Sequence, residues 1–274
     1  MDARRLSLAL LLSLQAPVLA RAYHDTSPAI EYSAQTLHAR EIRLSLTRVE
    51  IGVIDEIHLG TYTLPWLLRV KNAHGRYKFY DKDELAFSAD LGIFWLSLSD
   101  LEAFDDGGGS KDATLVIVPL QLNGTWKLKS SDRLSLGLSY TPIFLSGVGA
   151  VGENVDIRGV GATETVALHP SYELRASRTW AMVLDAHVLV LQRAQIDGAE
   201  SIRLNERTRA TLYQSAEADL KTGKQANLTL SALWSWEVFN LRLGLGYGHY
   251  NVPAAHLFFP TPFVMPEFDF YARF

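Results

Sequence analysis

Serine, histidine and aspartate, the residue types of a hydrolytic triad, occur together in one part of the chain. Asp185 and His187 are two residues apart, and Ser135 and Ser139 lie upstream of them. A serine nucleophile needs a histidine base within hydrogen-bond reach and a group that orients this base. If these segments are strands with a third strand between them, the serines lie roughly 9–10 Å from His187. We therefore predict no catalytic residues and expect that the protein is not an enzyme.

The candidate metal ligands are the carboxylates of one loop and the scattered histidines. Asp105, Asp106 and Asp112 surround three consecutive glycines at 107–109. Calcium sites need several oxygen ligands at defined spacing, which this loop lacks, and consecutive glycines favour mobility. The eight histidines include no metal-like pair at i, i+2 on one face. We expect a solvated outer loop, no metal site and no cofactor.

Apolar and polar residues alternate with period two along most of the chain after residue 41, which is typical of strands with two unlike faces. Leu134, Leu136 and Leu138 share one face, for example, and Arg133 and Ser135 share the other. No helical period interrupts this pattern. The fold class is therefore all-β, with expected strands at 41–47, 48–54, 57–64, 75–80, 84–98, 113–128, 132–147, 160–176, 180–194, 207–220, 225–237, 239–250 and 266–274.

Two architectures share this alternation, since the apolar face can point into a soluble barrel or outward to lipid. Three features favour lipid. The polar face is rich in Gly, Ser, Thr and Asn rather than Lys and Glu. Several strands exceed the ~9–11 residues that cross a membrane. Aromatic residues such as Trp126, Tyr172 and Trp180 lie at strand ends.

The last strand supplies the strongest single clue. Phe268, Phe270, Ala272 and Phe274 share one face, and an aromatic residue ends the chain. This pattern resembles the closing strand of bacterial outer-membrane β-barrel proteins. The resemblance implies that Phe268, Phe270 and Phe274 form an assembly signal, which the barrel-assembly machinery recognises. It is specific for the superfamily and the compartment, and it identifies no particular family.

An antiparallel transmembrane β-barrel from a bacterium has an even number of strands, whereas the segments above are odd in number. Either two short N-terminal segments form one strand, giving twelve, or residues 256–264 add one, giving fourteen. Pro260 and Pro262 argue against the second option. We expect about 12 strands, within a range of 10–14. Short periplasmic turns are expected at 129–132, 177–179 and 221–224, and outer loops at 99–112, 148–159 and 195–206.

The first residues have the layout of a secretory signal peptide. Arg4 and Arg5 precede an apolar run at 6–14, and small residues follow Pro17. We expect a signal peptide at 1–22, an irregular periplasmic lead at 23–40 and the β-barrel domain at 41–274. The location is then the outer membrane of a Gram-negative bacterium.

Composition agrees with an exported, self-sufficient fold. The 274 residues include no cysteine, 48% are hydrophobic, and the net charge is −4. These values exclude a disordered chain, a small disulfide-stapled domain and a strongly basic nucleic-acid binder. The expected partners are outer-membrane lipid and the barrel-assembly machinery, with no nucleic acid. The oligomeric state does not follow from the sequence.

Charges of both signs fall on the inward parity of the strands in near balance. A selective pore concentrates one sign at a constriction, whereas balanced charges in a narrow barrel pair with one another. We therefore expect a narrow, porin-like channel or transporter for small solutes. The alternatives are a non-conducting structural or surface-interaction barrel and, below it, an outer-membrane lipid-modifying enzyme. The candidate lumen residues are Arg133, Glu173, Arg175, Asp185, His187, Arg193, Arg209 and Arg242.

Overall fold

The computed structural model describes residues 33–67, 69–97, 112–128, 132–151, 155–177, 179–205, 208–219, 225–236, 238–249 and 262–274. The strands are β1 (Ile42–Ser45), β2 (Arg48–Ile54), β3 (Ile57–Tyr62), β4 (Lys71–Lys82), β5 (Leu85–Ser97), β6 (Asp112–Ile117), β7 (Leu120–Lys127), β8 (Asp132–Val151), β9 (Val155–Arg175), β10 (Trp180–Asn205), β11 (Thr208–Asp219), β12 (Ala226–Ser235), β13 (Phe239–Gly248) and β14 (Phe263–Arg273). A short helix, α2 (Thr63–Leu67), joins β3 to β4. Within these ranges no helix is long and apolar enough to cross a membrane.

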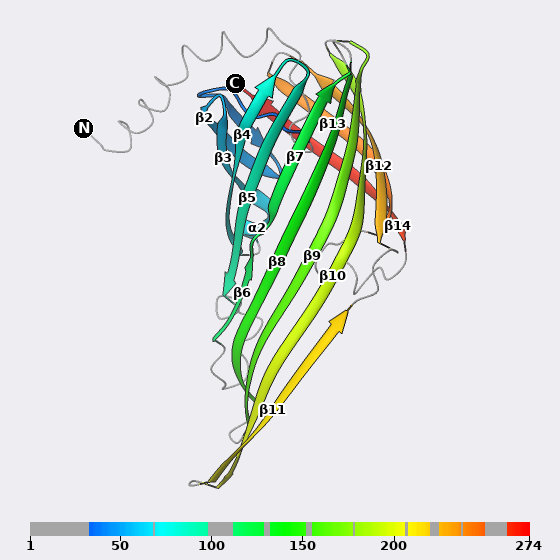
Figure 1. The fold of residues 1–274 in the computed structure, drawn as a ribbon. Coiled ribbons are helices and arrows are strands. Elements are labelled where there is room, and N and C mark those ends of the chain that lie inside the picture. Colours follow the sequence, from blue (N-terminus) through cyan, green and yellow to red (C-terminus); the bar gives the residue numbers. More distant parts are fainter. Residues whose placement is uncertain are drawn as a thin grey trace, which may run out of the picture.

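The strands form one antiparallel barrel that closes on itself (Figure 1). At the seam β1 pairs with β14, where Arg43 lies opposite Arg273. The barrel has 12 strand positions, because two of them are each occupied by two consecutive segments. This confirms the all-β barrel and the preferred strand number.

One shared position belongs to β6 and β7, which both pair with β5 on one side and β8 on the other. Pro119 lies between them and has no N–H to donate to the sheet. Its carbonyl still accepts the Gly92 N–H at 2.8 Å. The two segments therefore form one continuous strand that proline interrupts only in its hydrogen bonding.

The other shared position belongs to β11 and β12, which both run antiparallel to β10. Asp219 lies opposite Arg193 and Ala226 opposite Val188, so the β11–β12 side has two extra residues at this point. The expected merger of two N-terminal segments was wrong, because β1, β2 and β3 are separate strands. The turn expected at 221–224 lies outside the described residues, and β11 and β12 on either side of it run in the same direction.

Side chains alternate between the two faces of the wall as the sequence predicts. On the outer face Leu59, Leu122 and Leu245 are 50%, 56% and 64% exposed, whereas the inward-facing Ser88 and Thr125 are buried. An apolar outer band of this kind requires lipid around it. The structure therefore confirms an antiparallel β-barrel whose apolar face points outward, as a transmembrane barrel requires.

Three strands are longer than a membrane requires. β8, β9 and β10 contain 20, 21 and 26 residues, against ~9–11 for a crossing. With β11 they extend beyond the rest of the barrel, at the end opposite the C-terminus (Figure 1). The outer loops expected at 148–159 and 195–206 were wrong, because strands occupy the described residues of both segments. Outside the membrane neither face of a strand must be apolar, so strand pairing can continue there without a regular apolar–polar alternation.

The C-terminal residues lie at the seam. Phe268 and Phe270 point outward from β14 and are 53% and 42% exposed. Phe274 follows β14 and exchanges two backbone hydrogen bonds with Ile42, at 2.8 and 3.1 Å. The aromatic face of the last strand thus belongs to the lipid-facing surface beside the point of closure.

Candidate functional site

Part of the lumen is filled by the chain itself, because residues 33–40 lie against the inner wall. Ala34 has no exposed surface, and its N–H donates to Thr125 Oγ1 on β7 at 2.8 Å. Arg76 on β4 donates to two carbonyl groups of the segment, at 2.8 and 2.9 Å. The sequence predicts a periplasmic lead here. In the structure Ser33, Ala34, Thr36 and Leu37 are buried within the barrel, whereas residues 38–40 are exposed. We call residues 33–40 the lumen segment.

The lumen segment approaches β2 so closely that only glycine fits at position 52. A Cβ on Gly52 would lie 1.8 Å from the carbonyl oxygen of His38. The backbones are joined here by hydrogen bonds from Arg40 N–H to the Gly52 carbonyl at 2.7 Å and from Gly52 N–H to the Glu41 carbonyl at 2.8 Å. Gly52 therefore determines how the segment meets the wall.

The turn between β2 and β3 fixes the same segment outside the membrane span. Asp55 Oδ1 accepts the Ala39 N–H at 2.8 Å, and the Asp55 carbonyl accepts the Thr36 hydroxyl at 2.6 Å. The hydrogen bond from Ala39 holds the pKa of the Asp55 carboxyl below its ordinary value, because it stabilises the ionised form. An ionised Asp55 thus keeps the end of the lumen segment in place.

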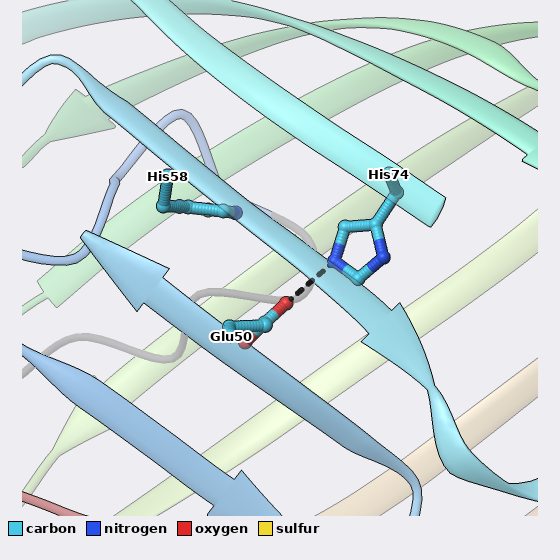
Figure 2. A group of neighbouring side chains, drawn as sticks. All are labelled: Glu50, His58 and His74. Atoms are coloured by element: carbon cyan, nitrogen blue, oxygen red, sulfur yellow. Dashed lines mark hydrogen bonds and ion pairs between the residues drawn. The ribbon is translucent and has the colours of Figure 1, made fainter. Parts of the chain in front are cut away.

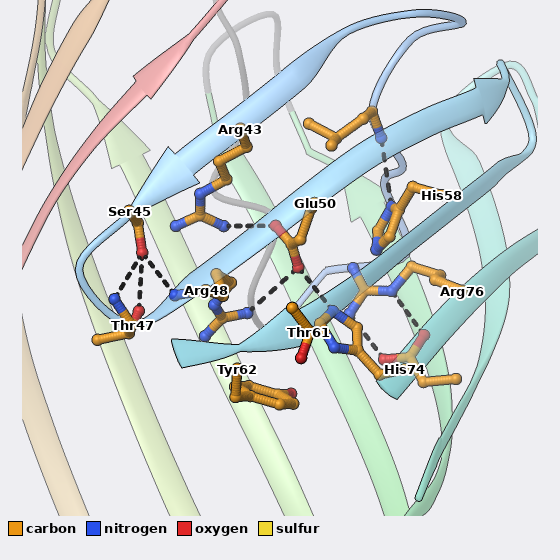
Figure 3. A network of polar contacts seen from close by, with 12 residues as sticks. Arg43, Ser45, Thr47, Arg48, Glu50, His58, Thr61, Tyr62, His74 and Arg76 are labelled. Atoms are coloured by element: carbon orange, nitrogen blue, oxygen red, sulfur yellow. Dashed lines mark hydrogen bonds and ion pairs between the residues drawn. The ribbon is translucent and has the colours of Figure 1, made fainter. Parts of the chain in front are cut away.

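Beside the lumen segment is a cavity of about 210 Å³. Figure 3 shows much of the polar network around it, which extends across neighbouring strands. The polar and aromatic lining comes from β2, β3, β4, β5 and β7 and consists of Arg48, Glu50, His58, Tyr62, His74, Arg76, Asp90 and Gln121.

Cross-strand register brings three of these residues together. Glu50 on β2 lies opposite Gly60 on β3, which lies opposite His74 on β4. Because Gly60 has no side chain, His74 Nε2 and Glu50 Oε1 meet across it at 3.0 Å. A Cβ at Gly60 would lie only 2.7 Å from Glu50 Cγ and 2.8 Å from His74 Cε1. His58 is close by on β3, and Figure 2 shows the three side chains converging.

Most charges around the cavity are paired. Arg43 lies between Glu50, at 3.3 Å, and Asp269, at 3.0 Å. Arg76 forms two hydrogen bonds with Asp90, at 2.6 and 2.7 Å. Buried pairs of this kind fix side chains in position, and they leave the wall with no dominant sign of charge.

The structure brings five of the predicted lumen residues into two ion-pair groups. Glu173 on β9 contacts Arg133 at 3.3 Å and Arg175 at 3.0 Å. Asp185 on β10 contacts Arg242 on β13 at 2.5 Å, and both side chains are less than 10% exposed. The first group connects β8 with β9, and the second connects β10 with β13 across β12.

The remaining predicted residues have different surroundings. His187 stacks on His169, with ring centroids 4.7 Å apart, and Arg193 is exposed. Asp105 and Asp106 lie outside the described residues, as does most of the loop expected at 99–112. Asp112 begins β6 and Arg209 lies in β11, but the side chains of these two residues lie outside the described part of the structure.

The serines considered as nucleophiles have partners other than His187. Ser139 Oγ lies 2.8 Å from His169 Nε2, and Ser135 Oγ lies 2.9 Å from Thr125 Oγ1. Asp185 Oδ2 contacts Arg242 on β13. The arrangement gives no positive support to hydrolytic chemistry.

Sequence reasoning did not identify the lumen segment or the cluster of Glu50, His58 and His74. Each of these three residues has the inward parity of its own strand, which is a signal present in the sequence. Their proximity depends on the register of β2, β3 and β4, which spacing along the chain does not contain.

No protein-family model matches the chain, and no curated protein matches it. Among solved structures it is similar to the toluene transporter TodX of Pseudomonas putida, with 10% identity over 85% of this chain and 86% of that one and a TM-score of 0.36. It is also similar to the toluene transporter TbuX of Ralstonia pickettii, with 8% identity, coverage of 83% and 69%, and a TM-score of 0.33. An outer-membrane channel of Pseudomonas putida F1 has 10% identity, coverage of 90% and 98%, and a TM-score of 0.26.

Proposed function

We propose that the protein is a narrow outer-membrane channel for small solutes, in which the lumen segment restricts passage. The observation that carries this proposal is a closed barrel with a polar inner wall, a lumen cavity of about 210 Å³ and a peptide segment beside that cavity. Twelve strands enclose a lumen between the filled interior of 8-stranded barrels and the open channel of 16-stranded porins. Such a lumen has room for small solutes when a segment inside it moves.

The contacts of the lumen segment support a gate rather than a permanent core. Its contacts include hydrogen bonds to Thr125, Arg76 and Asp55. Polar contacts of this kind contribute about 0.5–1.5 kcal/mol each, or more with a charged partner. The segment is therefore held firmly enough to close the lumen and loosely enough to be displaced.

The paired charges of the inner wall predict weak ion selectivity. Neither the network around Arg43 and Arg76 nor the groups around Glu173 and Asp185 present one sign of charge to the lumen. Solutes would then be selected by size more than by charge.

The proposal includes export on the signal peptide at 1–22 and insertion by the barrel-assembly machinery into the outer membrane of a Gram-negative bacterium. The alternating apolar outer wall and the aromatic last strand support this location. Membrane fractionation of cells that express the full chain tests it, and recovery in the soluble fraction would contradict it.

The test of the function is swelling of liposomes that contain the refolded full chain, in sugars of increasing size. We expect slow swelling with a sharp size limit, and faster swelling for Thr125→Val, which removes the acceptor of the Ala34 N–H. A matched control, Thr229→Val, changes the same residue type on β12. If folded wild type and Thr125→Val both exclude every solute, the protein is a non-conducting structural barrel.

A further inference from the structure

The cavity contains a set of metal-ligating groups whose chemistry goes beyond a solute channel. Glu50, His58 and His74 each offer one ligand atom, and these atoms all lie within 4.8 Å of one another (Figure 2). We propose that the three side chains bind a divalent transition-metal ion of the zinc type inside the barrel. Two imidazoles and one carboxylate form a known zinc ligand set that leaves a fourth position for water or solute.

The distances between the ligand atoms suit a tetrahedral zinc ion after a small adjustment of the side chains. Two ligands of a tetrahedral zinc ion lie ~3.3–3.5 Å apart, because each is ~2.0–2.2 Å from the metal. His74 Nε2 and Glu50 Oε1, at 3.0 Å, are already close to this separation. The widest separation, 4.8 Å, must shorten. The adjoining cavity gives the imidazole rings room to turn, and it also gives an ion access.

The ring nitrogen Nδ1 of His74 has no hydrogen-bond partner among the described residues. Its Nε2 faces Glu50, whereas its Nδ1 is buried without a hydrogen-bond partner. A neutral imidazole has one donor and one acceptor, so donation to Glu50 leaves a buried lone pair on Nδ1. A buried polar atom without a partner costs about 1–3 kcal/mol. Coordination through Nε2 moves the ring proton to Nδ1, and the cavity that His74 lines gives this N–H space for a hydrogen-bonded water.

His58 connects the proposed metal site to the lumen segment. The Leu37 N–H lies 3.4 Å from His58 Nδ1, so Nδ1 accepts and Nε2 carries the proton. Coordination through Nε2 requires that this proton move to Nδ1, with no net release. A protonated Nδ1 cannot accept from Leu37. Metal binding is therefore expected to weaken one contact that holds the lumen segment.

The surrounding arginines determine how strongly a cation binds. Arg43 is also paired with Asp269, and Arg76 is paired with Asp90. Arg48 lies 3.7 Å from Glu50, which makes it the positive charge nearest the carboxylate besides Arg43. Replacing Arg48 with a neutral residue should therefore strengthen metal binding, whereas loss of a ligand should weaken it.

The experiment is titration of the refolded full chain, first stripped with a chelator, with Zn²⁺ by calorimetry and with Co²⁺ by its ligand-field absorption. We expect one ion per chain. His74→Gln should weaken binding by about 10–100-fold or more, and Arg48→Gln should strengthen it. His187→Gln is the matched control, because it removes another histidine of the barrel, and it should leave the affinity unchanged. Hydrogen exchange at the Leu37 amide should become faster with Zn²⁺.

Equal affinities of wild type and His74→Gln would overturn the proposal, as would loss of binding in His187→Gln alone. If His74→Gln does not fold, the metal affinity of Arg48→Gln tests the proposal. Unchanged or weaker metal binding in this variant would contradict a site at Glu50. Unchanged exchange at Leu37 on metal binding would exclude His58 as the third ligand.

Discussion

Replacing Gly52 with alanine is expected to move the lumen segment and open the barrel. The added Cβ would lie 1.8 Å from the His38 carbonyl oxygen and 2.7 Å from its carbonyl carbon. Non-bonded heavy atoms prefer about 3.5 Å, so the segment must shift by roughly 1.7 Å. The obstructing atoms belong to the backbone, so a side-chain rotation cannot relieve the contact.

The energetic effect follows from the bonds that the shift breaks. Arg40 donates to the Gly52 carbonyl and Gly52 donates to the Glu41 carbonyl. At about 0.5–1.5 kcal/mol for each hydrogen bond, the segment loses about 1–3 kcal/mol of its attachment. A free-energy change of this size alters the ratio of open to closed molecules by about 5–150-fold.

The assay is the open probability of the refolded protein in planar bilayers. Gly75→Ala is the matched control, because its Cβ would press on the flexible, lipid-facing side chain of Leu59 at 2.8 Å and would lie at an ordinary contact distance of 3.5 Å from the His58 carbonyl oxygen. We expect a higher open probability for Gly52→Ala and no change for Gly75→Ala. If folded Gly52→Ala opens no more often than wild type, the lumen segment is not the obstruction.

Three further predictions concern stability, pH and assembly. Asp185→Asn removes one partner of a buried ion pair and leaves Arg242 less well compensated, so urea unfolding in vesicles should show a loss of about 3–5 kcal/mol; a loss below 1 kcal/mol would contradict the pairing. The lowered pKa of Asp55 means that its contribution is present above the ordinary aspartate pKa and is lost as the pH falls through the lower folded-state pKa. Compared with Asp55→Asn, wild type should therefore lose its protection of the Ala39 amide against hydrogen exchange only below about pH 4. A difference in exchange between the two proteins that does not change with pH would refute this. Deleting Phe274 removes two hydrogen bonds at the seam, so assembled barrel in cells should decrease, and an unchanged yield would contradict its role as an assembly signal.

The barrel could be predicted because the membrane imposes the pattern that the sequence displays. Each spanning strand must present apolar residues to lipid and small polar residues to the lumen, as Leu134, Leu136 and Ser135 do. Where this requirement ends, the prediction fails. Residues 155–159 of β9 pair with residues 198–202 of β10, beyond the strand ends predicted at 160 and 194.

The functional site was less predictable because it depends on contacts between distant segments. Parity places Glu50 and His74 on inward faces, but only the register through Gly60 brings them together. The lumen segment has no periodicity of its own, and its place follows from single contacts such as that of Ala34 with Thr125, 91 residues away. Gly52 was part of a predicted strand, and the need for glycine there becomes visible only beside His38.

The position of the lumen segment is the central claim, and thiol accessibility tests it most directly. The chain has no cysteine, so single substitutions report one site each. Ala34→Cys and Ala39→Cys change the same residue type in the same segment, but Ala34 is fully buried in the lumen and Ala39 is exposed. In the refolded barrel we predict rapid modification of Ala39→Cys by a bulky maleimide and modification of Ala34→Cys at least about 100-fold slower, which corresponds to about 2.7 kcal/mol of protection. Equal rates would show that the segment lies outside the barrel and would contradict the account.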